Sequence, residues 1–190
     1  KAHGEIPQSG FVPDADFPVI YGEKGGAHVS LHSHDKTVIQ KLNAGERPNI
    51  VIGKADCFVK EISDRQKEQF AFYLKTNDLK GSIDQTDEGI RLHVDGVFAH
   101  AAMPYNGVNA ALHLLNFVGC AYDDQLAKDL YSLLKDWQGK PEHINKDGAY
   151  MGFLTMSTGI VRMDPERTDI LVDIRYPNDL DAKAIMAGFD

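Results

Sequence analysis

Alternation of apolar and polar positions marks several short segments along the chain. Because successive side chains of a strand point to opposite faces, such alternation predicts strands with one covered face. Two pairs of these segments are joined by short turns, at residues 86–89 and 164–167, and are predicted to be hairpins. The pattern predicts strands at residues 27–33, 49–60, 81–86, 89–98, 155–163 and 169–176.

Elsewhere apolar residues recur every three or four positions, which is the spacing of one helix face. Ser63 and Gln66 have the spacing of a capping box, so a helix is predicted from there to about residue 75. Further helices are predicted from residue 105 to Gly119, over residues 126–137, and over residues 179–186. A turn-rich entry is expected at residues 1–26 and a loop at residues 148–152, since both stretches are rich in glycine or proline.

The order of these elements predicts the fold class. Strands and helices are mixed rather than strictly alternating, which favours an α+β layered sandwich over a doubly wound parallel sheet. Helices are expected to cover one face of a mostly antiparallel sheet. Two small sandwiches within one chain fit the same pattern.

Composition narrows the possible functions. The chain has 190 residues, a length that suits one domain or two small ones. Hydrophobic residues make up 43% of it, and its net charge is -8. The acidic balance argues against nucleic-acid binding, and no apolar run is long enough to cross a membrane. Cys57 and Cys120 are too few for a disulfide framework and lack zinc-knuckle spacing. They indicate a reducing, cytoplasmic compartment, with a single disulfide between them as the alternative.

Three histidines crowd one predicted strand. His28, His32 and His34 would all point to the same face, where imidazoles could bind a metal ion. The alternative is a solvated edge strand on which the histidines have no shared role. A self-contained metal site is therefore one hypothesis for this chain.

His100 lies at a predicted strand-to-helix junction, among small residues and ahead of Pro104. An uncrowded imidazole in that position could donate a hydrogen bond to an oxyanion that develops in a cleft. The alternative is a histidine whose hydrogen bonds are satisfied within its own loop.

Three other polar residues are candidates for binding. Arg175, close to the end of a predicted strand, could grip a carboxylate with two hydrogen bonds, and its alternative partner is Asp173. Asn49 could direct its amide at a ligand or serve only the turn that it occupies. Asp14 could supply an oxygen ligand to a cation. The metallopeptidase, serine-hydrolase, P-loop and dinucleotide motifs are absent, so the chain alone does not assemble a complete active site.

Several short motifs occur in order along the chain, at residues 10–18 (GFVPDADFP), 21–25 (YGEKG), 46–51 (ERPNIV), 99–100 (AH) with 104 (P), 107–110 (GVNA), 154–155 (LT) and 173–177 (DIRYP). Taken together, these segments resemble the co-catalytic zinc metallopeptidases that include carnosinases, succinyl-diaminopimelate desuccinylase and glutamate carboxypeptidase. The resemblance is strongest to the bacterial dipeptidase branch, peptidase V. The order and spacing of these motifs agree over nearly the whole chain.

The resemblance implies a role for each candidate residue in an intact enzyme that holds two zinc ions. Asp14 would be a zinc ligand, and His100 and Asn49 would polarise the carbonyl group of the scissile peptide bond. Arg175 would bind the C-terminal carboxylate of a dipeptide substrate. Most zinc ligands of the family lie in a catalytic domain on either side of an inserted lid, so this chain is expected to be inactive by itself.

The same resemblance implies an organisation. Residues 1–26 would lead in from the catalytic domain of the same full-length chain, and residues 27–190 would form the lid. The lid would consist of two α/β subdomains of the ferredoxin-like type. The competing hypothesis is a non-catalytic binding or dimerisation module that keeps the lid fold.

Overall fold

The chain folds around one seven-stranded sheet. The structure, a computed structural model, describes residue 20 and residues 22–189. The strands run in the order β1-β9-β8-β2-β3-β5-β4, and every neighbouring pair is antiparallel. They are β1 (Gly25–Ser33), β2 (Ile39–Ala44), β3 (Lys54–Val59), β4 (Lys80–Thr86), β5 (Gly89–Asp95), β8 (Thr155–Met163) and β9 (Thr168–Tyr176). Two very short strands, β6 (Asp147–Gly148) and β7 (Gly152–Phe153), pair separately.

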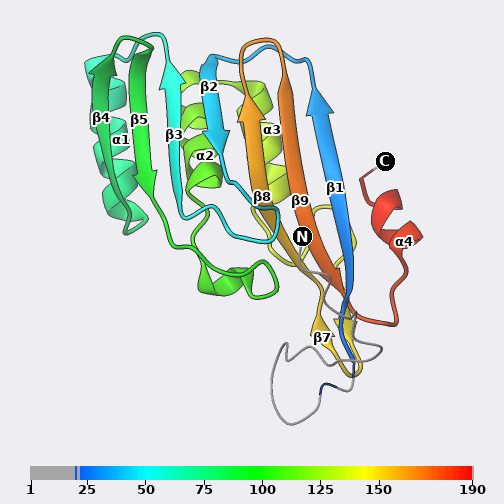
Figure 1. The fold of residues 1–190 in the computed structure, drawn as a ribbon. Helices are drawn as coiled ribbons and strands as arrows, with labels where there is room; N and C mark the ends of the chain where they lie inside the picture. Colours follow the sequence, from blue (N-terminus) through cyan, green and yellow to red (C-terminus); the bar gives the residue numbers. More distant parts are fainter. Residues whose placement is uncertain (1–19, 21, 190) are drawn as a thin grey trace, which may run out of the picture.

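Three helices lie behind this sheet and leave its other face open (Figure 1). They are α1 (Asp64–Thr76), α2 (Ala110–Tyr122) and α3 (Gln125–Leu134). A short helix, α4 (Ala182–Ala187), lies beside β1, and the 3-10 turn η1 (Pro104–Asn106) precedes α2. The α+β layered architecture with an antiparallel sheet, expected from the sequence, is confirmed.

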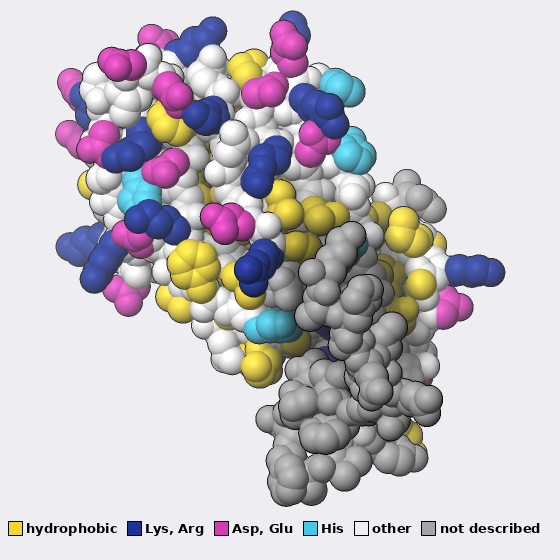
Figure 2. Space-filling view, in the orientation of Figure 1, with side chains coloured by type: hydrophobic (Ala, Val, Ile, Leu, Met, Phe, Trp, Pro, Cys, Tyr) yellow, Lys and Arg dark blue, Asp and Glu magenta, His cyan; other side chains and the backbone are white. Residues whose placement is uncertain are grey.

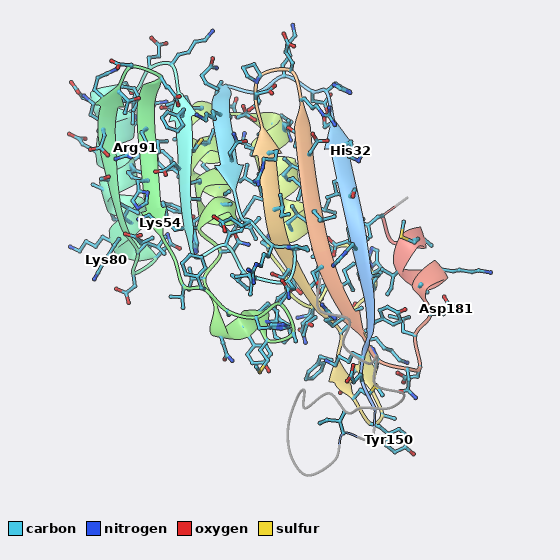
Figure 3. The ribbon with its side chains drawn as sticks, viewed as in Figure 1. His32, Lys54, Lys80, Arg91, Tyr150 and Asp181 are labelled. Atoms are coloured by element: carbon cyan, nitrogen blue, oxygen red, sulfur yellow. The ribbon has the colours of Figure 1, made fainter. Side chains whose placement is uncertain are left out.

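In β3 and β5 the alternation in the sequence explains why the strands bury one face. In β3 the alternate residues Ala55, Cys57 and Val59 are buried among the core side chains beneath the helices. The residues between them point to the open face, where acidic and basic side chains mix over β3, β5 and β4 (Figure 2). Arg91 of β5, for example, donates to Asp84 of β4 at 2.8 Å on this face (Figure 3). The open face is therefore stabilised by cross-strand pairs of charges rather than by a second layer.

Most expected elements are present, and the differences have identifiable causes. Both hairpins, the helix capped by Ser63 and the helix in residues 126–137 are confirmed within a few residues. The strand expected at residues 49–60 begins only at Lys54, since the residues before it form a turn and an isolated bridge. The strand β2 was not predicted, because a bulge after Ile39 interrupts its alternation. The loop expected at residues 148–152 joins β6 to β7.

Gly119 was wrongly predicted to end a helix. It lies inside α2, which runs to Tyr122 and ends where Asp123 adopts a left-handed conformation (φ 56°). A Cβ atom at position 119 would lie 2.9 Å from Cγ of Lys128 in α3. The glycine therefore allows two helices to pack closely, a role that its position in the sequence does not reveal.

The residues expected to form two subdomains contribute to a single sheet. Its halves, β1-β9-β8 and β3-β5-β4, are joined by β2, which pairs with both β8 and β3. Among the described residues, no helix has both the length and the apolar character needed to cross a membrane.

Candidate functional site

Two loops that are far apart in the sequence pair at one end of the sheet. The Val51 N–H donates to the Ala99 carbonyl at 2.9 Å, and the Ala101 N–H donates to the Asn49 carbonyl at 2.9 Å. These bonds flank an antiparallel bridge between Ile50 and His100. The fold thus brings together the backbones of Asn49 and His100, two of the candidate site residues.

The loop that carries His100 is closed at its neck. Val97 and Val108 exchange two backbone hydrogen bonds of 2.9 Å, so the residues between them form a compact excursion from the sheet. Gly96 is required at this neck, because a Cβ atom there would collide with the Val108 carbonyl. Asn109 then caps α2 and donates from Nδ2 to the Thr158 carbonyl of β8 at 2.8 Å. The loop is therefore fixed to both the helix layer and the sheet.

The imidazole of His100 is exposed on this loop and has a defined tautomer. The Ala102 N–H donates to its Nδ1 at 3.1 Å. Because Nδ1 accepts a hydrogen bond, the neutral ring carries its proton on Nε2. An N–H donor on a rigid loop can stabilise negative charge on a ligand oxygen.

Asn49 belongs to a turn that packs on β8. Pro48 lies so close to Gly159 of β8 that a side chain at position 159 would collide with the Pro48 carbonyl. Asn49 is partly buried. A cavity of about 680 Å³ lies beside this turn, and Ile50, Phe98, Lys54 and Arg162 are among its lining residues.

The guanidinium of Arg175 is bound to the neighbouring carboxylate of Asp173. Its Nε donates to Oδ1 at 2.8 Å and its Nη2 donates to Oδ2 at 3.0 Å. Asp173 is 1% exposed, whereas Arg175 remains 31% exposed. The ion pair considered as the alternative for Arg175 is therefore present, and part of the guanidinium still faces solvent.

Strand register gives the position of Arg175 relative to the Asn49 turn along β8. Arg175 opposes Thr155 on β8, two positions from the pair that Asp173 makes with Ser157. The turn of Asn49 packs on Gly159 of the same strand. The fold thus brings Asn49 and His100 together, and Arg175 lies four positions away along β8, with no contact to the other two. The fourth candidate residue, Asp14, lies outside the described residues.

The three histidines of the β1 region are not metal ligands to one ion. His28 pairs with Asp173 and His32 pairs with Asp169, each across the β1–β9 register, and His34 donates to the Glu166 carbonyl at 3.1 Å. In the part of the chain that the structure describes, no three His, Cys, Asp or Glu side chains could hold a metal ion. The hypothesis of a self-contained metal site is therefore wrong for these residues, because each imidazole already has its own partner on or beside β9.

The sequence identified candidate site residues but not the tertiary contacts that position them. The Ile50–His100 bridge and the link from His28 to Asp173 depend on pairing between distant segments. The turn glycine Gly96 was a usable signal, since an isolated glycine at a strand end often marks a close backbone approach.

No protein-family model matches the chain. It is 29% identical over 202 aligned residues to "Putative dipeptidase YtjP" of Bacillus subtilis, an alignment that covers 99% of the chain and 44% of that protein. It is 32% identical over 190 aligned residues to a "Putative dipeptidase" of Staphylococcus epidermidis, covering 91% of the chain and 40% of that protein. A "Putative dipeptidase" of Staphylococcus aureus is 31% identical, with 97% of the chain and 43% of that protein aligned. The chain thus spans roughly two-fifths of the length of these relatives.

Proposed function

We propose that this chain is the lid and substrate-binding part of a cytoplasmic, zinc-dependent dipeptidase that hydrolyses short peptides with metal-activated water. The names of the relatives support peptide hydrolysis by the full-length protein. The motifs shared with peptidase V support the lid assignment. The observation that carries the proposal is the rigid loop on which His100 presents an Nε2–H donor beside Asn49.

Each proposed residue has a distinct task. His100 would donate from Nε2 to the oxygen of the scissile carbonyl as that oxygen becomes negative, which lowers the barrier to attack. Asn49, whose backbone carbonyl accepts from the Ala101 N–H beside His100, would orient or polarise the same group. Arg175 would bind the carboxylate at the end of the peptide through the part of its guanidinium that Asp173 leaves free.

The described residues do not by themselves fit a zinc centre, because they contain no suitable cluster of ligand side chains. In this proposal Asp14 supplies one ligand and the catalytic domain of the full-length protein supplies the others. The 190-residue chain alone is accordingly expected to be inactive.

The decisive experiment is His100→Ala in the full-length protein, assayed with unmodified dipeptides. Loss of one oxyanion donor should lower kcat by about 100- to 1000-fold. His32→Ala is the control, because His32 is an exposed histidine paired with Asp169 near the other end of β1 (Figure 3). If kcat is unchanged in His100→Ala, the oxyanion role is wrong, and a full-length protein with no hydrolysis at all would favour a binding module.

Removal of metal tests the remaining part of the proposal. Dialysis of the full-length protein against a chelator should abolish hydrolysis, and zinc should restore it. Activity that survives complete removal of metal would contradict zinc dependence while leaving the role of His100 open to its own test.

A further inference from the structure

Arg175 is one of four neighbouring positions on two paired strands. In the antiparallel register of β1 and β9, Gly26 opposes Arg175 and His28 opposes Asp173. Gly26 and His28 are two positions apart on β1, as Asp173 and Arg175 are on β9, so all four lie on the same face of the sheet. Three of the four carry polar side chains, and the fourth is a glycine.

Asp173 holds one particular edge of the guanidinium. Its carboxylate accepts from Nε and Nη2 of Arg175 and, at 3.1 Å, from Nε2 of His28. A carboxylate that is 1% exposed and accepts three hydrogen bonds is held firmly in place. A guanidinium has five N–H groups in a fixed plane, so the edge formed by Nη1 and the outer side of Nη2 points away from Asp173.

The space next to that outer edge is kept open by Gly26. A Cβ atom at position 26 would lie 3.3 Å from Nη1 of Arg175. A hollow of about 180 Å³ adjoins this point and is lined by Gly26, Ala27, His28 and Arg175. A ligand group can therefore reach Nη1 without displacing the pair between Arg175 and Asp173.

We infer that Asp173 is a positioning residue, which fixes Arg175 through its inner edge so that the outer edge, above Gly26, receives the substrate carboxylate. This inference rests on the proposed function, in which Arg175 binds the end of a peptide. It adds that the preference for a free C-terminal carboxylate over a C-terminal amide depends on Asp173 and on the absence of a side chain at position 26. A planar carboxylate would meet two parallel N–H groups in a fixed direction, whereas a C-terminal amide has only one acceptor oxygen to offer.

A matched control exists on the same two strands. Asp169 accepts from Arg167 and pairs with His32, so its two partners are an arginine and a histidine, as they are for Asp173. This second set lies at the opposite end of β1 and β9, and Asp169 is 31% exposed. Asp173→Asn and Asp169→Asn therefore make the same chemical change beside the same kinds of partner, and only Asp173 adjoins Arg175.

The experiment compares these variants in the full-length protein with two substrates, a dipeptide with a free C-terminus and its C-terminally amidated form. Asp173→Asn should raise KM for the free dipeptide about tenfold, the effect of one charge-assisted hydrogen bond, because the new amide nitrogen opposes the donors that it faces. It should leave kcat within about twofold and leave KM for the amide unchanged, as expected when only binding of the carboxylate is lost. Asp169→Asn should leave KM unchanged for both substrates.

The direction of the change separates positioning from charge. If the negative charge of Asp173 were removed and nothing else changed, Arg175 would attract the substrate carboxylate more strongly and KM would fall. A lowered KM for the free dipeptide, or an equal rise for both substrates, would overturn the positioning role. Gly26→Ala provides a second variant that alters no charge, and it should raise KM for the free dipeptide alone. An unchanged KM in Gly26→Ala would show that the outer edge is not the binding edge.

Failure of the inference can be told apart from failure of the proposed function. Arg175→Lys should raise KM for the free dipeptide if Arg175 binds the carboxylate, since an ammonium group cannot make the paired contact. If wild type shows no preference for the free C-terminus and Arg175→Lys changes nothing, the carboxylate role of Arg175 itself is wrong. If Arg175→Lys has its effect and Asp173→Asn has none, only the positioning role of Asp173 fails.

Discussion

Single hydroxyl groups connect the helices behind the sheet, and Tyr73 is the clearest case. Its hydroxyl lies 2.9 Å from Nδ1 of His113 and accepts from Nδ2 of Asn116 at 3.0 Å. Burial raises the pKa of Tyr73 to about 12 and lowers the pKa of His113, so at neutral pH the neutral hydroxyl donates to a neutral imidazole. Tyr73→Phe removes the shared partner of two half-buried groups and should lower the free energy of unfolding by about 1 kcal/mol. Urea denaturation measures this, with Tyr150→Phe as the control, since Tyr150 is 92% exposed (Figure 3). Equal stability of Tyr73→Phe and wild type would contradict the network.

Glu142 makes a prediction about pH. It is 2% exposed, and its carboxylate oxygens have no hydrogen-bond partner among the described residues. Burial, with a smaller contribution from the charge of Asp136, raises the pKa of Glu142 above its usual range. A carboxyl group with a raised pKa in the folded state binds more protons there than in the unfolded state, so stability falls as pH rises through that range. Glu142→Gln should therefore raise Tm at pH 8, and the gain should shrink as pH falls toward about 4.3, the ordinary pKa of glutamate. The exposed Glu68→Gln is the control, and a gain that does not vary with pH would argue against a buried charge.

At the scale of single residues, the sequence could supply candidates but not their partners. His100, Asn49 and Arg175 could be selected because a polar side chain stands beside small residues, a proline or a strand end. Asp173 could be named as a partner of Arg175, since residues two apart on a strand share a face. The contribution of His28 could not, because it depends on the register between β1 and β9, which local patterns do not encode.

Helix starts allow a comparison between two elements. Ser63 caps α1 in an exposed capping box, accepting from the Gln66 N–H at 3.3 Å. Asp124 caps α3 while 6% exposed, and it also accepts from the Val38 N–H at 2.7 Å and the Thr37 hydroxyl at 2.8 Å. Ser63→Ala should cost about 1 kcal/mol of stability, the usual value of an N-cap. Asp124→Ala should cost about 3 kcal/mol, because it also leaves donors that precede β2 without their partner. Equal losses in chemical denaturation would show that the link between α3 and the β2 segment contributes nothing.

The elements that the sequence revealed are those with a complete local signal. Regular alternation in both hairpins and the Ser63 capping box are sufficient without knowledge of the rest of the fold. By contrast, β2 has a bulge after Ile39, and Gly119 serves helix packing rather than helix termination. In both cases tertiary contacts decide the local structure, and a single sequence carries little information about them.

At the scale of the whole molecule, the continuous sheet raises the question of whether its two halves fold as one unit. Leu92 is fully buried on β5, near one edge of the sheet. The single tryptophan, Trp137, lies in the other half, since its carbonyl accepts a hydrogen bond from the Met156 N–H of β8. Both regions belong to one connected cluster of buried side chains, so damage to one should destabilise the other. Leu92→Ala in the 190-residue chain should cost about 2–5 kcal/mol, and the midpoint of unfolding should fall equally by Trp137 fluorescence and by circular dichroism. Ile174→Ala in β9 is the reciprocal variant and should move both midpoints in the same way. If Leu92→Ala leaves the Trp137 midpoint in place while circular dichroism shifts, the two halves are separate cooperative units that merely share a sheet, which is how two subdomains within one lid would behave.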